Sequence, residues 1–491
     1  QAMNLLLVTA DQWRGDSLGA AGHGCVRTPH VDRLAAEGAL FTRHYGQATP
    51  CGPARASLYT GLYALNHRSI TNGTPLDRRH THLARELRAL GRTPAVFGYT
   101  DTSLDPRRLP AADPRLKTYE GFAPEWEVVQ PLLEDGGPWL AWLEEKGYGR
   151  LDLADVYGGA LGEPAPVAAE HGETAFLTDR FLAWLDRQEA GWCAHVSFIK
   201  PHPPLVAPAP FHAAVHPDDV PAPTGLARDA VAALHPYLGV LAAQPRSAGW
   251  WDKPAGDDPA SVRRARAVYY GLIQHVDAEI GRLVAALEAR GELDDTLVVV
   301  TSDHGEMLGD HGLWGKAGFF PQAFHVPLVM RGPGVTPGRR VDAVTEHVDL
   351  LPTLLEALGG EVPLQADGRS LVPWLAGEAP AAWRRAAFVE HDFRDVETAT
   401  FERALGLAPE HCQLAALFAP ELAYVHFNGL PPLAFDLARD PEMTIDVAAE
   451  RARAPEMLEA AQAMLTRRMD AAERRLTGAK LTAQGVVGRF A

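Results

Sequence analysis

A cysteine in an unusual local sequence carries the strongest chemical signal in this chain. Residues 51–55 read CGPAR, and residues 56–61 continue as ASLYTG. The proline suits the first turn of a helix and Gly61 suits its end, so Cys51 is predicted to lie at a helix N-terminus. Backbone N–H groups and the helix dipole favour an anion there, and Arg55, one turn further on, is placed to pair with it. Taken alone, this pattern leaves open a low-pKa or merely buried cysteine at a helix cap.

Two acidic residues follow apolar runs that have the character of buried strands. Asp11 and Gln12 come after the first run, and Asp303 and His304 come after a later one. In open α/β sheets, ligands bind at the carboxyl ends of the strands. Two carboxylates, an amide oxygen and an imidazole make an oxygen and nitrogen site for a divalent cation. A lone aspartate after a strand is more often a turn residue, but two such pairs beside the cysteine turn favour a metal.

Further polar residues stand in a stiff segment and beyond the second acidic pair. Residues 200–204 read KPHPP after another apolar run. Prolines on both sides keep this segment out of a helix, which fits an oriented His202. His311 and Lys316 follow His304 along the chain. Each of these residues, taken alone, has the solvated loop residue as its simpler interpretation.

The elements that must position these residues alternate between strands and helices. Short continuous apolar runs, typical of strands buried on both faces, cover residues 5–10, 94–98, 193–199 and 297–301. Helical patterns lie between and after them, at residues 262–290 and 350–358. This alternation predicts an α/β fold with helices on both faces of the sheet.

Changes of pattern along the chain suggest two domains. Residues 105–173 are rich in Pro, Gly and Trp and have weak periodicity, so we interpret them as an insertion over the sheet edge. Short strand-like pieces follow residue 380, and a closing amphipathic helix is expected at residues 455–476. We therefore expect a catalytic domain over residues 1–380 and a small α+β sheet domain with a helical oligomerisation tail over residues 381–491.

Composition excludes several classes of protein. The 491 residues include 62 acidic and 46 basic side chains, and the net charge of -16 argues against nucleic acid and anionic membranes as partners. There is no uncharged apolar run of about 18 residues, so no membrane span is expected. The four cysteines (Cys25, Cys51, Cys193 and Cys412) form no CxxC pair, which argues against a zinc ribbon or a disulfide framework. A cytoplasmic location is expected, or a periplasmic one if a signal peptide has been removed.

These pieces, in this order, resemble the sulfatase branch of the alkaline phosphatase superfamily. Within that branch the sequence is most similar to the phosphonate monoester hydrolases and their arylsulfatase relatives. The resemblance covers nearly the whole chain. It rests on residues 10–14, 51–61, 66–68, 72–77, 98–100, 200–204, 301–310 and 430–433.

The resemblance implies a fold, a modified residue and a metal. The fold would be an alkaline phosphatase-like large mixed sheet between helices, with a smaller C-terminal α+β domain. Cys51 would be oxidised to formylglycine by a formylglycine-generating enzyme. One divalent ion would be bound by Asp11, Gln12, the modified Cys51, Asp303 and His304. Gln12 and His304 replace the Asp and Asn of typical calcium sulfatases, which favours manganese over calcium. Assembly into homodimers or homotetramers through C-terminal segments is also implied.

The resemblance also assigns residues to the substrate. Those that bind the anion or transfer protons would be Arg55, Asn72, Tyr99, His202 and Lys316. Asp101 departs from the pattern, because phosphonate hydrolases carry threonine there. A carboxylate at that position would repel an anionic substrate unless it is protonated or hydrogen-bonded. Lys200 stands where arginine is usual.

The expected function is hydrolysis of small-molecule sulfate monoesters and phosphonate monoesters, and of phosphate diesters as well. A hydroxyl of the hydrated aldehyde at residue 51 would attack sulfur or phosphorus, while Arg55, His202 and Lys316 stabilise the developing charge and protonate the leaving group. The second hydroxyl would then expel the product by C–O cleavage. The alternatives are a phosphatase-like esterase that uses unmodified Cys51, and a non-catalytic binding protein that retains the fold. The complete metal and anion set argues against the latter.

Overall fold

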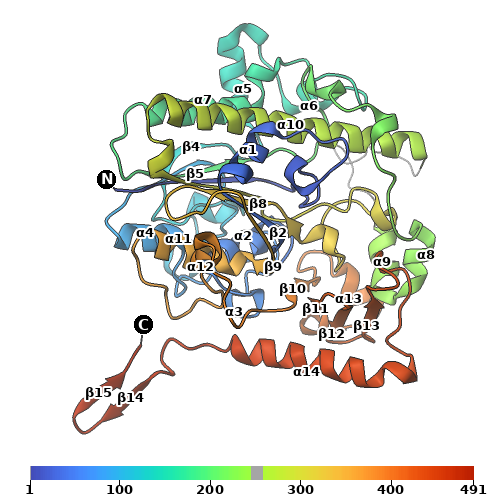
Figure 1. Ribbon diagram of the computed structural model, residues 1–491. Coiled ribbons are helices and arrows are strands. Elements are labelled where there is room, and N and C mark those ends of the chain that lie inside the picture. The colour runs from blue at the N-terminus through green and yellow to red at the C-terminus, as the bar shows by residue number, and fades with distance from the viewer. Residues whose placement is uncertain (1, 245–257, 491) are drawn as a thin grey trace.

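A large mixed sheet forms the centre of the protein (Figure 1). The computed structural model describes residues 2–244 and 258–490. Nine strands lie in the order β4-β3-β5-β1-β6-β8-β2-β7, and β9 pairs with β2. Their bounds are β1 Asn4–Ala10, β2 Ala39–Tyr45, β3 Pro94–Gly98, β4 Glu127–Pro131, β5 Cys193–Phe198, β6 Thr296–Thr301, β7 His325–Val326, β8 Leu328–Arg331 and β9 Arg339–Glu346. The four predicted strands are confirmed within a residue of their expected ends.

The central strands run parallel and end at one edge of the sheet. Strand β1 is parallel to β5 on one side and to β6 on the other, with Thr9 opposite both Ser197 and Thr301. Strand β3 is parallel to β5 as well. Strand β8 then pairs antiparallel with both β6 and β2, which makes the sheet mixed, as expected. The segments that follow β1, β3, β5 and β6 are therefore brought together at the carboxyl edge.

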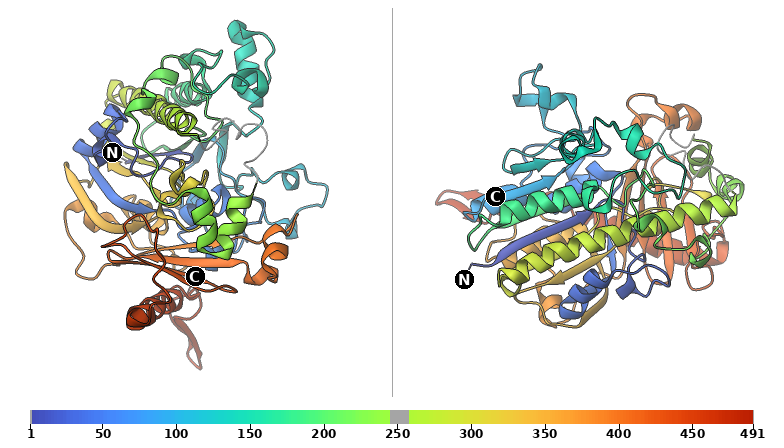
Figure 2. Two further views of the ribbon diagram at one scale, coloured as in Figure 1. Left: turned by 90° about the vertical axis from the view of Figure 1, so that its right-hand side faces the viewer. Right: turned by 90° about the horizontal axis from the view of Figure 1, so that it is seen from above.

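Helices cover both faces of this sheet, and the alternation of side chains along β1 shows how. Leu6 and Val8 are buried against one layer of helices, and Leu5 and Leu7 against the other. The first layer contains α1 (Pro29–Glu37), α7 (Glu173–Leu185) and α10 (Pro259–Ala289), which Figure 2 shows from above. The second contains α2 (Cys51–Thr60), α4 (Leu83–Ala89), α11 (Leu350–Ala357) and α12 (Val372–Ala376). The fold class predicted from the sequence is confirmed.

Residues 105–173 differ from the expected insertion in one respect. Strand β4 lies within this segment and pairs parallel with β3, so it extends the main sheet at its edge. Its residues are exposed or half-buried, and an edge strand of this kind has no apolar run that the sequence could reveal. The rest of the segment contains α5 (Gly137–Leu143) and α6 (Leu153–Tyr157), which lie beyond α7 and α10 (Figure 1).

A smaller antiparallel sheet follows the large one. Its strands are β10 (Ala387–Asp392), β11 (Gln413–Phe418), β12 (Leu422–Phe427) and β13 (Leu433–Asp436), in sequence order. Helix α14 (Ala454–Asp470) packs on one face through Met464, and α8 (Arg228–Leu234) and α9 (Pro236–Ala243) pack on the other. The short helices α3 (Ala64–His67) and α13 (Thr400–Leu405) complete the set. This is the small α+β unit that the sequence predicted.

The tail is less helical than expected. The helix predicted to reach residue 476 ends at Asp470. Ala471 is buried, and its carbonyl accepts a hydrogen bond from the Asn66 side chain, so a tertiary contact draws the chain out of the helical path. A hairpin of β14 (Ala479–Thr482) and β15 (Gly485–Gly488) follows and projects from the body (Figure 1). None of the helices in the described ranges has the length and apolar character needed to cross a bilayer.

Candidate active site

Cys51 is the first residue of helix α2, and every residue of this helix is buried. The helix ends at Gly61, which has a φ of 68° and supplies the left-handed C-cap that the sequence predicted. Cys51 lies at the N-terminal end, where backbone N–H groups lack partners within the helix. The side chain is 4% exposed. The prediction of a cysteine at a helix N-terminus is therefore confirmed.

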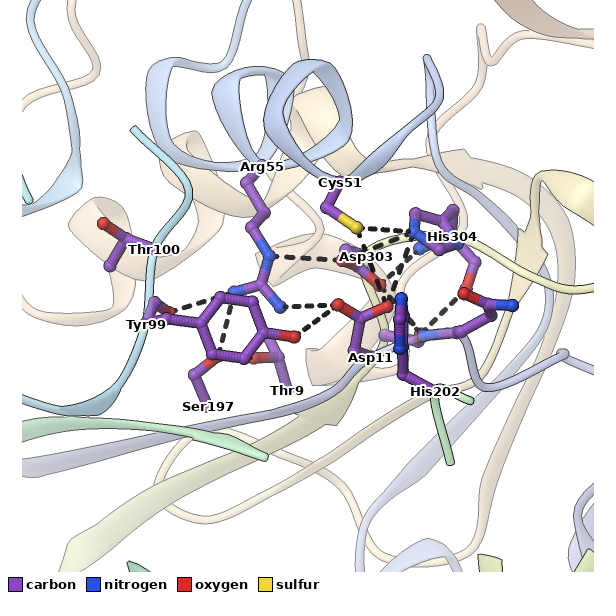
Figure 3. Close-up of polar contacts among 12 residues, drawn as sticks. Thr9, Asp11, Cys51, Arg55, Tyr99, Thr100, Ser197, His202, Asp303 and His304 are labelled. Atoms are coloured by element: carbon purple, nitrogen blue, oxygen red, sulfur yellow. Dashed lines mark hydrogen bonds and ion pairs between the residues drawn. The ribbon is translucent and has the colours of Figure 1, made fainter. Parts of the chain in front are cut away.

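Four potential ligand groups converge in front of this helix, as Figure 3 shows. Asp11 follows β1, and Asp303 and His304 follow the neighbouring parallel strand β6. One atom from each of these three residues and from Cys51 can be chosen so that all four atoms lie within 4.8 Å of one another. All four residues are buried. Adjacent parallel strands that end at the same edge explain why residues so far apart in the sequence meet here.

This donor set fits a divalent cation. Two carboxylates and an imidazole are oxygen and nitrogen donors that divalent cations use in proteins. Metal–ligand distances of about 2.0–2.6 Å place two ligands on opposite sides of an ion about 4–5 Å apart, and the cluster's ligand atoms, all within 4.8 Å of one another, are compatible with this range. Buried carboxylates also require nearby positive charge. The residues that could hold the ion are Asp11, residue 51, Asp303 and His304.

Hydrogen bonds fix the orientation of Asp303 and His304. One carboxylate oxygen of Asp303 accepts from the backbone N–H groups of Gln12, at 3.1 Å, and of His304, at 2.9 Å. The other accepts from Nε of Arg55 at 3.1 Å. Nδ1 of His304 lies 3.0 Å from the carbonyl oxygen of Gly305, which can only accept, so the proton is on Nδ1. Nε2 then faces Cys51 Sγ at 3.3 Å with its lone pair.

Burial and neighbouring charges set the protonation of this pair. Burial lowers the pKa of His304 to about 4, against the opposing effect of Asp303. Burial acts to raise the pKa of Asp303, but His304 and then Arg55 outweigh it and hold that pKa below its usual range. Because His304 is neutral near pH 7, we regard Arg55 as the cation that keeps Asp303 ionised. A neutral imidazole and an ionised carboxylate are the forms that bind metal ions.

Arg55 is held from several sides. Nη1 donates to the hydroxyl of Ser197 at 2.8 Å and to the carbonyl of Tyr99 at 3.2 Å, and the guanidinium lies 4.2 Å from the centroid of the Tyr99 ring. Nη2 lies 3.7 Å from a carboxylate oxygen of Asp11. That nitrogen is buried and makes no hydrogen bond to any residue in the described part of the chain. It is a donor that a bound anion could use.

Lys316 joins the cluster from the loop after β6. Its Nζ lies 3.0 Å from Cys51 Sγ and 3.1 Å from the amide oxygen of Gln12. The Gln12 amide nitrogen in turn donates to the buried carboxylate of Glu306. Burial acts to lower the pKa of Lys316, but Cys51 and then Asp11 outweigh it, so the pKa is raised and Lys316 is charged. Lys316 therefore contacts residue 51 directly and links it to Gln12.

The remaining predicted residues lie around the same centre. The Asn72 side-chain oxygen accepts from the backbone N–H of Gly52 at 2.8 Å, and the Tyr99 hydroxyl donates to Asp11. Asp101 is buried, and burial raises its pKa well above the usual range, against the opposing effect of Arg55. His202 is close enough to Lys316 for that charge to act on it, and burial followed by Lys316 lowers the pKa of His202 well below its usual range. The structure thus brings every predicted site residue to one place.

His311 and four other residues complete the comparison with the sequence. The ring of His311 stacks on Phe320 at 3.9 Å, which is a core contact. Sequence reasoning missed the polar partners that support the cluster, which are Thr9, Ser197, Glu306 and His347. Thr9 and Ser197 could have been noticed as hydroxyl side chains inside apolar strand runs. His347 lies far along the chain, and no local pattern marks it.

Comparison with known proteins places the chain in a family. The sulfatase family model matches residues 3–360, and a model described as N-sulphoglucosamine sulphohydrolase, C-terminal, matches residues 309–470. The multifunctional alkaline phosphatase superfamily protein PehA of Trinickia caryophylli is 38% identical over 508 aligned positions, which cover 99% of each chain. The phosphonate monoester hydrolase structure of Agrobacterium radiobacter is 43% identical, with a TM-score of 0.95 and full coverage of both chains. That of Silicibacter pomeroyi is 40% identical, with a TM-score of 0.94 over 100% of this chain and 99% of the other.

A large mixed sheet that carries this cluster at the carboxyl ends of its strands, together with these similarities, defines a member of the alkaline phosphatase superfamily. Within the superfamily, the chain belongs to the sulfatase family. The resemblance found in the sequence is confirmed. The protein is therefore an enzyme, a hydrolase that acts on sulfate or phosphonate esters.

Proposed function

We propose that this enzyme hydrolyses sulfate monoesters and phosphonate monoesters, and phosphate diesters as well, with formylglycine at position 51 and one bound divalent metal ion. The observation that carries the proposal is the position of Cys51. It begins a buried helix, faces His304 and Lys316, and shares a four-residue cluster with Asp11 and Asp303. Similarity to two phosphonate monoester hydrolases supports the substrate class.

Residue 51, once modified, would supply the nucleophile, and a bound metal ion would assist it. Asp11, residue 51, Asp303 and His304 would hold the ion, and the Gln12 amide oxygen, which accepts from Lys316 in this structure, would be a fifth ligand. Manganese is favoured over calcium because one ligand is an imidazole. A hydrated aldehyde beside a divalent ion offers a hydroxyl of lowered pKa at neutral pH.

The other residues bind and orient the anion. Lys316 contacts residue 51 and Arg55 contacts Asp303, and the two charged groups would hold the non-bridging oxygens of the ester. Asn72 contacts the N-terminus of α2, and the Tyr99 hydroxyl fixes Asp11. Asp101 would contact the substrate as a neutral carboxyl. His202 or Lys316 would protonate the leaving oxygen. Burial and then Lys316 lower the pKa of His202 well below its usual range, so His202 would carry the proton once a bound substrate anion raises that pKa.

Two other functions are less well supported. A phosphatase-like esterase that uses unmodified Cys51 needs a thiolate, yet burial and the charge of Asp11 raise the pKa of this thiol well above its usual range. A non-catalytic binding protein has no need of a full set of ligands and anion-binding residues in one buried place. Retention of the whole set favours an active enzyme.

Partners and location belong to the same proposal. Formylglycine requires a generating enzyme that acts on the CGPAR segment. We propose that the protein acts in the cytoplasm as a homodimer or homotetramer. The exposed apolar side chains of the C-terminal hairpin, Leu481, Val486 and Val487, support self-association through this segment.

The test joins mass spectrometry with a substrate panel. The peptide of residues 44–55 should show CH2SH replaced by CHO, and Cys51→Ala should abolish turnover of aryl sulfate and aryl phosphonate monoesters. Cys412→Ala, which removes another buried thiol, is the matched control and should retain activity. Asp11→Ala and Asp303→Ala should lose bound metal and activity together. Fully active enzyme with only cysteine at position 51, or with no metal, would refute the proposal.

A further inference from the structure

Lys200 is a buried cation that the proposed chemistry does not use. Its side chain is 4% exposed. Its Nζ donates to the carbonyl oxygens of His202 and Pro204, both at 3.0 Å, and pairs with a carboxylate oxygen of Glu173 at 3.4 Å. An ammonium group has three N–H donors, so these three acceptors use its full capacity. Such a saturated arrangement fixes the positions of the groups that it joins.

The acceptor Glu173 is itself anchored. It is the first residue of α7, and its carboxylate accepts a hydrogen bond from the Tyr157 hydroxyl at 2.7 Å. The ring centroid of Tyr157, the last residue of α6, lies 4.7 Å from Nζ of Lys200. Both residues are buried. Lys200 therefore ties the loop after β5 to two helices outside the central sheet.

The loop needs such an anchor because of its composition. Residues 200–204 contain three prolines, which have no backbone N–H to donate. His202 donates its N–H to the carbonyl of Ile199 at 3.0 Å, and its Nδ1 lies 2.6 Å from the carbonyl oxygen of Pro203. The carbonyl of His202 receives a hydrogen bond from Lys200, and that of Pro204 receives one from Lys200 in addition to the backbone N–H of Val206. The direction of the His202 side chain thus depends on contacts made by Lys200.

We propose that Lys200, held by Glu173 and Tyr157, is a positioning residue that aims the imidazole of His202 at the leaving-group oxygen of the substrate. This inference rests on the proposed function, in which His202, as the imidazolium formed beside the bound substrate anion, keeps Nδ1–H on the Pro203 carbonyl and protonates that oxygen through Nε2. Lys200 touches the backbone of the loop and acts only through His202. A small displacement of a proton donor is enough to slow proton transfer by an order of magnitude or more.

The leaving group gives the proposal a specific signature. A 4-nitrophenolate ion leaves readily without a proton, whereas phenolate, which is more basic, depends on protonation. Lys200→Met keeps the length of the side chain and removes its donors. The variant should lower kcat/KM for a phenyl sulfate or phosphonate monoester by about tenfold. For the matching 4-nitrophenyl monoester it should lower kcat/KM by only about twofold, because general acid catalysis matters more for the phenyl ester. Lys200→Arg should restore part of the loss.

Two controls separate positioning from folding. Lys146→Met makes the same chemical change at an exposed lysine that stacks on Trp142 in the same outer segment, and it should leave both esters unaffected. In a His202→Ala background, Lys200→Met should cause no further loss with the phenyl ester, because its effect passes through His202. If Lys200→Met does not fold, Glu173→Gln replaces it and the same comparison decides.

The outcomes are distinct. Selective loss with the phenyl ester and non-additivity with His202→Ala support the inference. Equal losses with both esters, or full additivity, overturn it and leave Lys200 as a structural residue. Failure of the unaltered enzyme to turn over either ester would instead refute the proposed function, so the two failures cannot be confused.

Discussion

At the scale of single residues, the site balances buried charges of opposite sign. Asp11 and Asp303 are buried beside Arg55 and Lys316, with an ion pair of 3.1 Å between Arg55 and Asp303. Removing one partner of a buried ion pair leaves an uncompensated charge, which destabilises a protein by about 3–5 kcal/mol. These residues therefore bear on folding as well as on chemistry, and variants of them need a stability measurement beside the kinetic one.

Asp101 allows a test of how a carboxyl group in the site affects the turnover of substrates of different charge. Burial raises its pKa well above the usual range, so the carboxyl is neutral at low pH and becomes a repulsive charge only as pH rises through that raised pKa. An ionised Asp101 about 6 Å from a unit charge would add roughly 3 kcal/mol of repulsion at an effective dielectric of about 20, and about twice that for a dianion. We expect Asp101→Asn to leave the kcat/KM ratio of aryl phosphate to aryl sulfate unchanged at low pH and to raise it at high pH.

The ratio should be measured across the pH range in both proteins. Asp113→Asn removes a carboxylate that pairs with Arg115 and serves as the control. A ratio that already differs at low pH would mean that Asp101 is ionised throughout. A ratio that never differs would mean that Asp101 has a purely structural role.

His195 is a buried histidine whose protonation makes the folded protein sensitive to acid. Burial, followed by the charge of Arg55, lowers its pKa to about 3, while the hydrogen bond with the Leu7 carbonyl opposes this. In the unfolded chain this histidine has a pKa near 6.5 and is protonated below that pH, whereas in the folded chain it stays neutral. Stability is therefore lost as pH falls below about 6.5, by about 1.4 kcal/mol per pH unit for this residue, until the pH approaches the folded pKa.

Denaturant unfolding at a series of pH values checks this expectation. Between about pH 6 and pH 4, His195→Gln should reduce the slope of the unfolding free energy against pH by about 1.4 kcal/mol per pH unit, which is the contribution of one proton. His216→Gln, at an exposed histidine, is the matched control. The slope with pH carries the test, since absolute stability also reflects lost packing. An unchanged slope would count against a neutral buried His195.

At the scale of elements, close packing between β3 and β5 sets the positions of site residues. Gly98 ends β3 with a φ of 100°, and a Cβ there would lie 2.1 Å from the carbonyl oxygen of Ser197. Tyr99 follows Gly98 directly, and the Ser197 hydroxyl binds Arg55. A side chain at position 98 would therefore push apart the two strands that present these groups.

We expect Gly98→Ala to destabilise the protein by about 3 kcal/mol or more, from the strained φ and the steric clash together, and to impair activity. Gly91→Ala is the matched control, because Gly91 also has a positive φ, 77°, but a Cβ there meets nothing within 4 Å. It should lose only about 1 kcal/mol and stay active. Thermal unfolding and aryl ester turnover measure both effects. Equal behaviour of the two variants would contradict the packing argument.

At the scale of the whole molecule, the projecting hairpin carries several exposed apolar side chains close together. Leu481 is 81% exposed and Val487 58%, on an arm that stands away from the body (Figure 1). Burying such side chains against a second copy of the chain would stabilise an oligomer. We propose that this hairpin packs against a neighbouring subunit.

Truncation after residue 476 is expected to reduce the molecular mass measured by light scattering after size exclusion, because the arm is lost. Leu481→Asp with Val487→Asp should do the same while leaving kcat per subunit close to that of the unaltered enzyme. Val396→Asp, at an 84% exposed valine elsewhere, should change nothing. An unaltered mass in the truncated protein would show that the arm is not the contact.

Local patterns in the sequence were sufficient for several parts of the protein. The proline and glycine around Cys51 mark the start and end of α2 because their backbone preferences act within a few residues. The central strands are continuous apolar runs because both faces of the sheet are covered. The pairs that begin with Asp11 and Asp303 follow such strands, and the shared carboxyl edge of a parallel sheet was enough to predict that they meet.

Only the tertiary structure decided the rest. The hydroxyls of Thr9 and Ser197 meet although the residues are 188 positions apart, and Lys200 finds its acceptors through the course of one loop and the position of α7. Strand β4 forms because it pairs with β3 at the edge of the main sheet. Helix α14 ends because of a tertiary contact with Asn66. No local pattern in the sequence marks either feature. Side-chain partners of this kind are selected by strand order and packing, whereas helix ends and buried strands are specified by neighbouring residues. For that reason the sequence by itself determined the fold class and the reactive groups, and the packed chain determined how those groups are held.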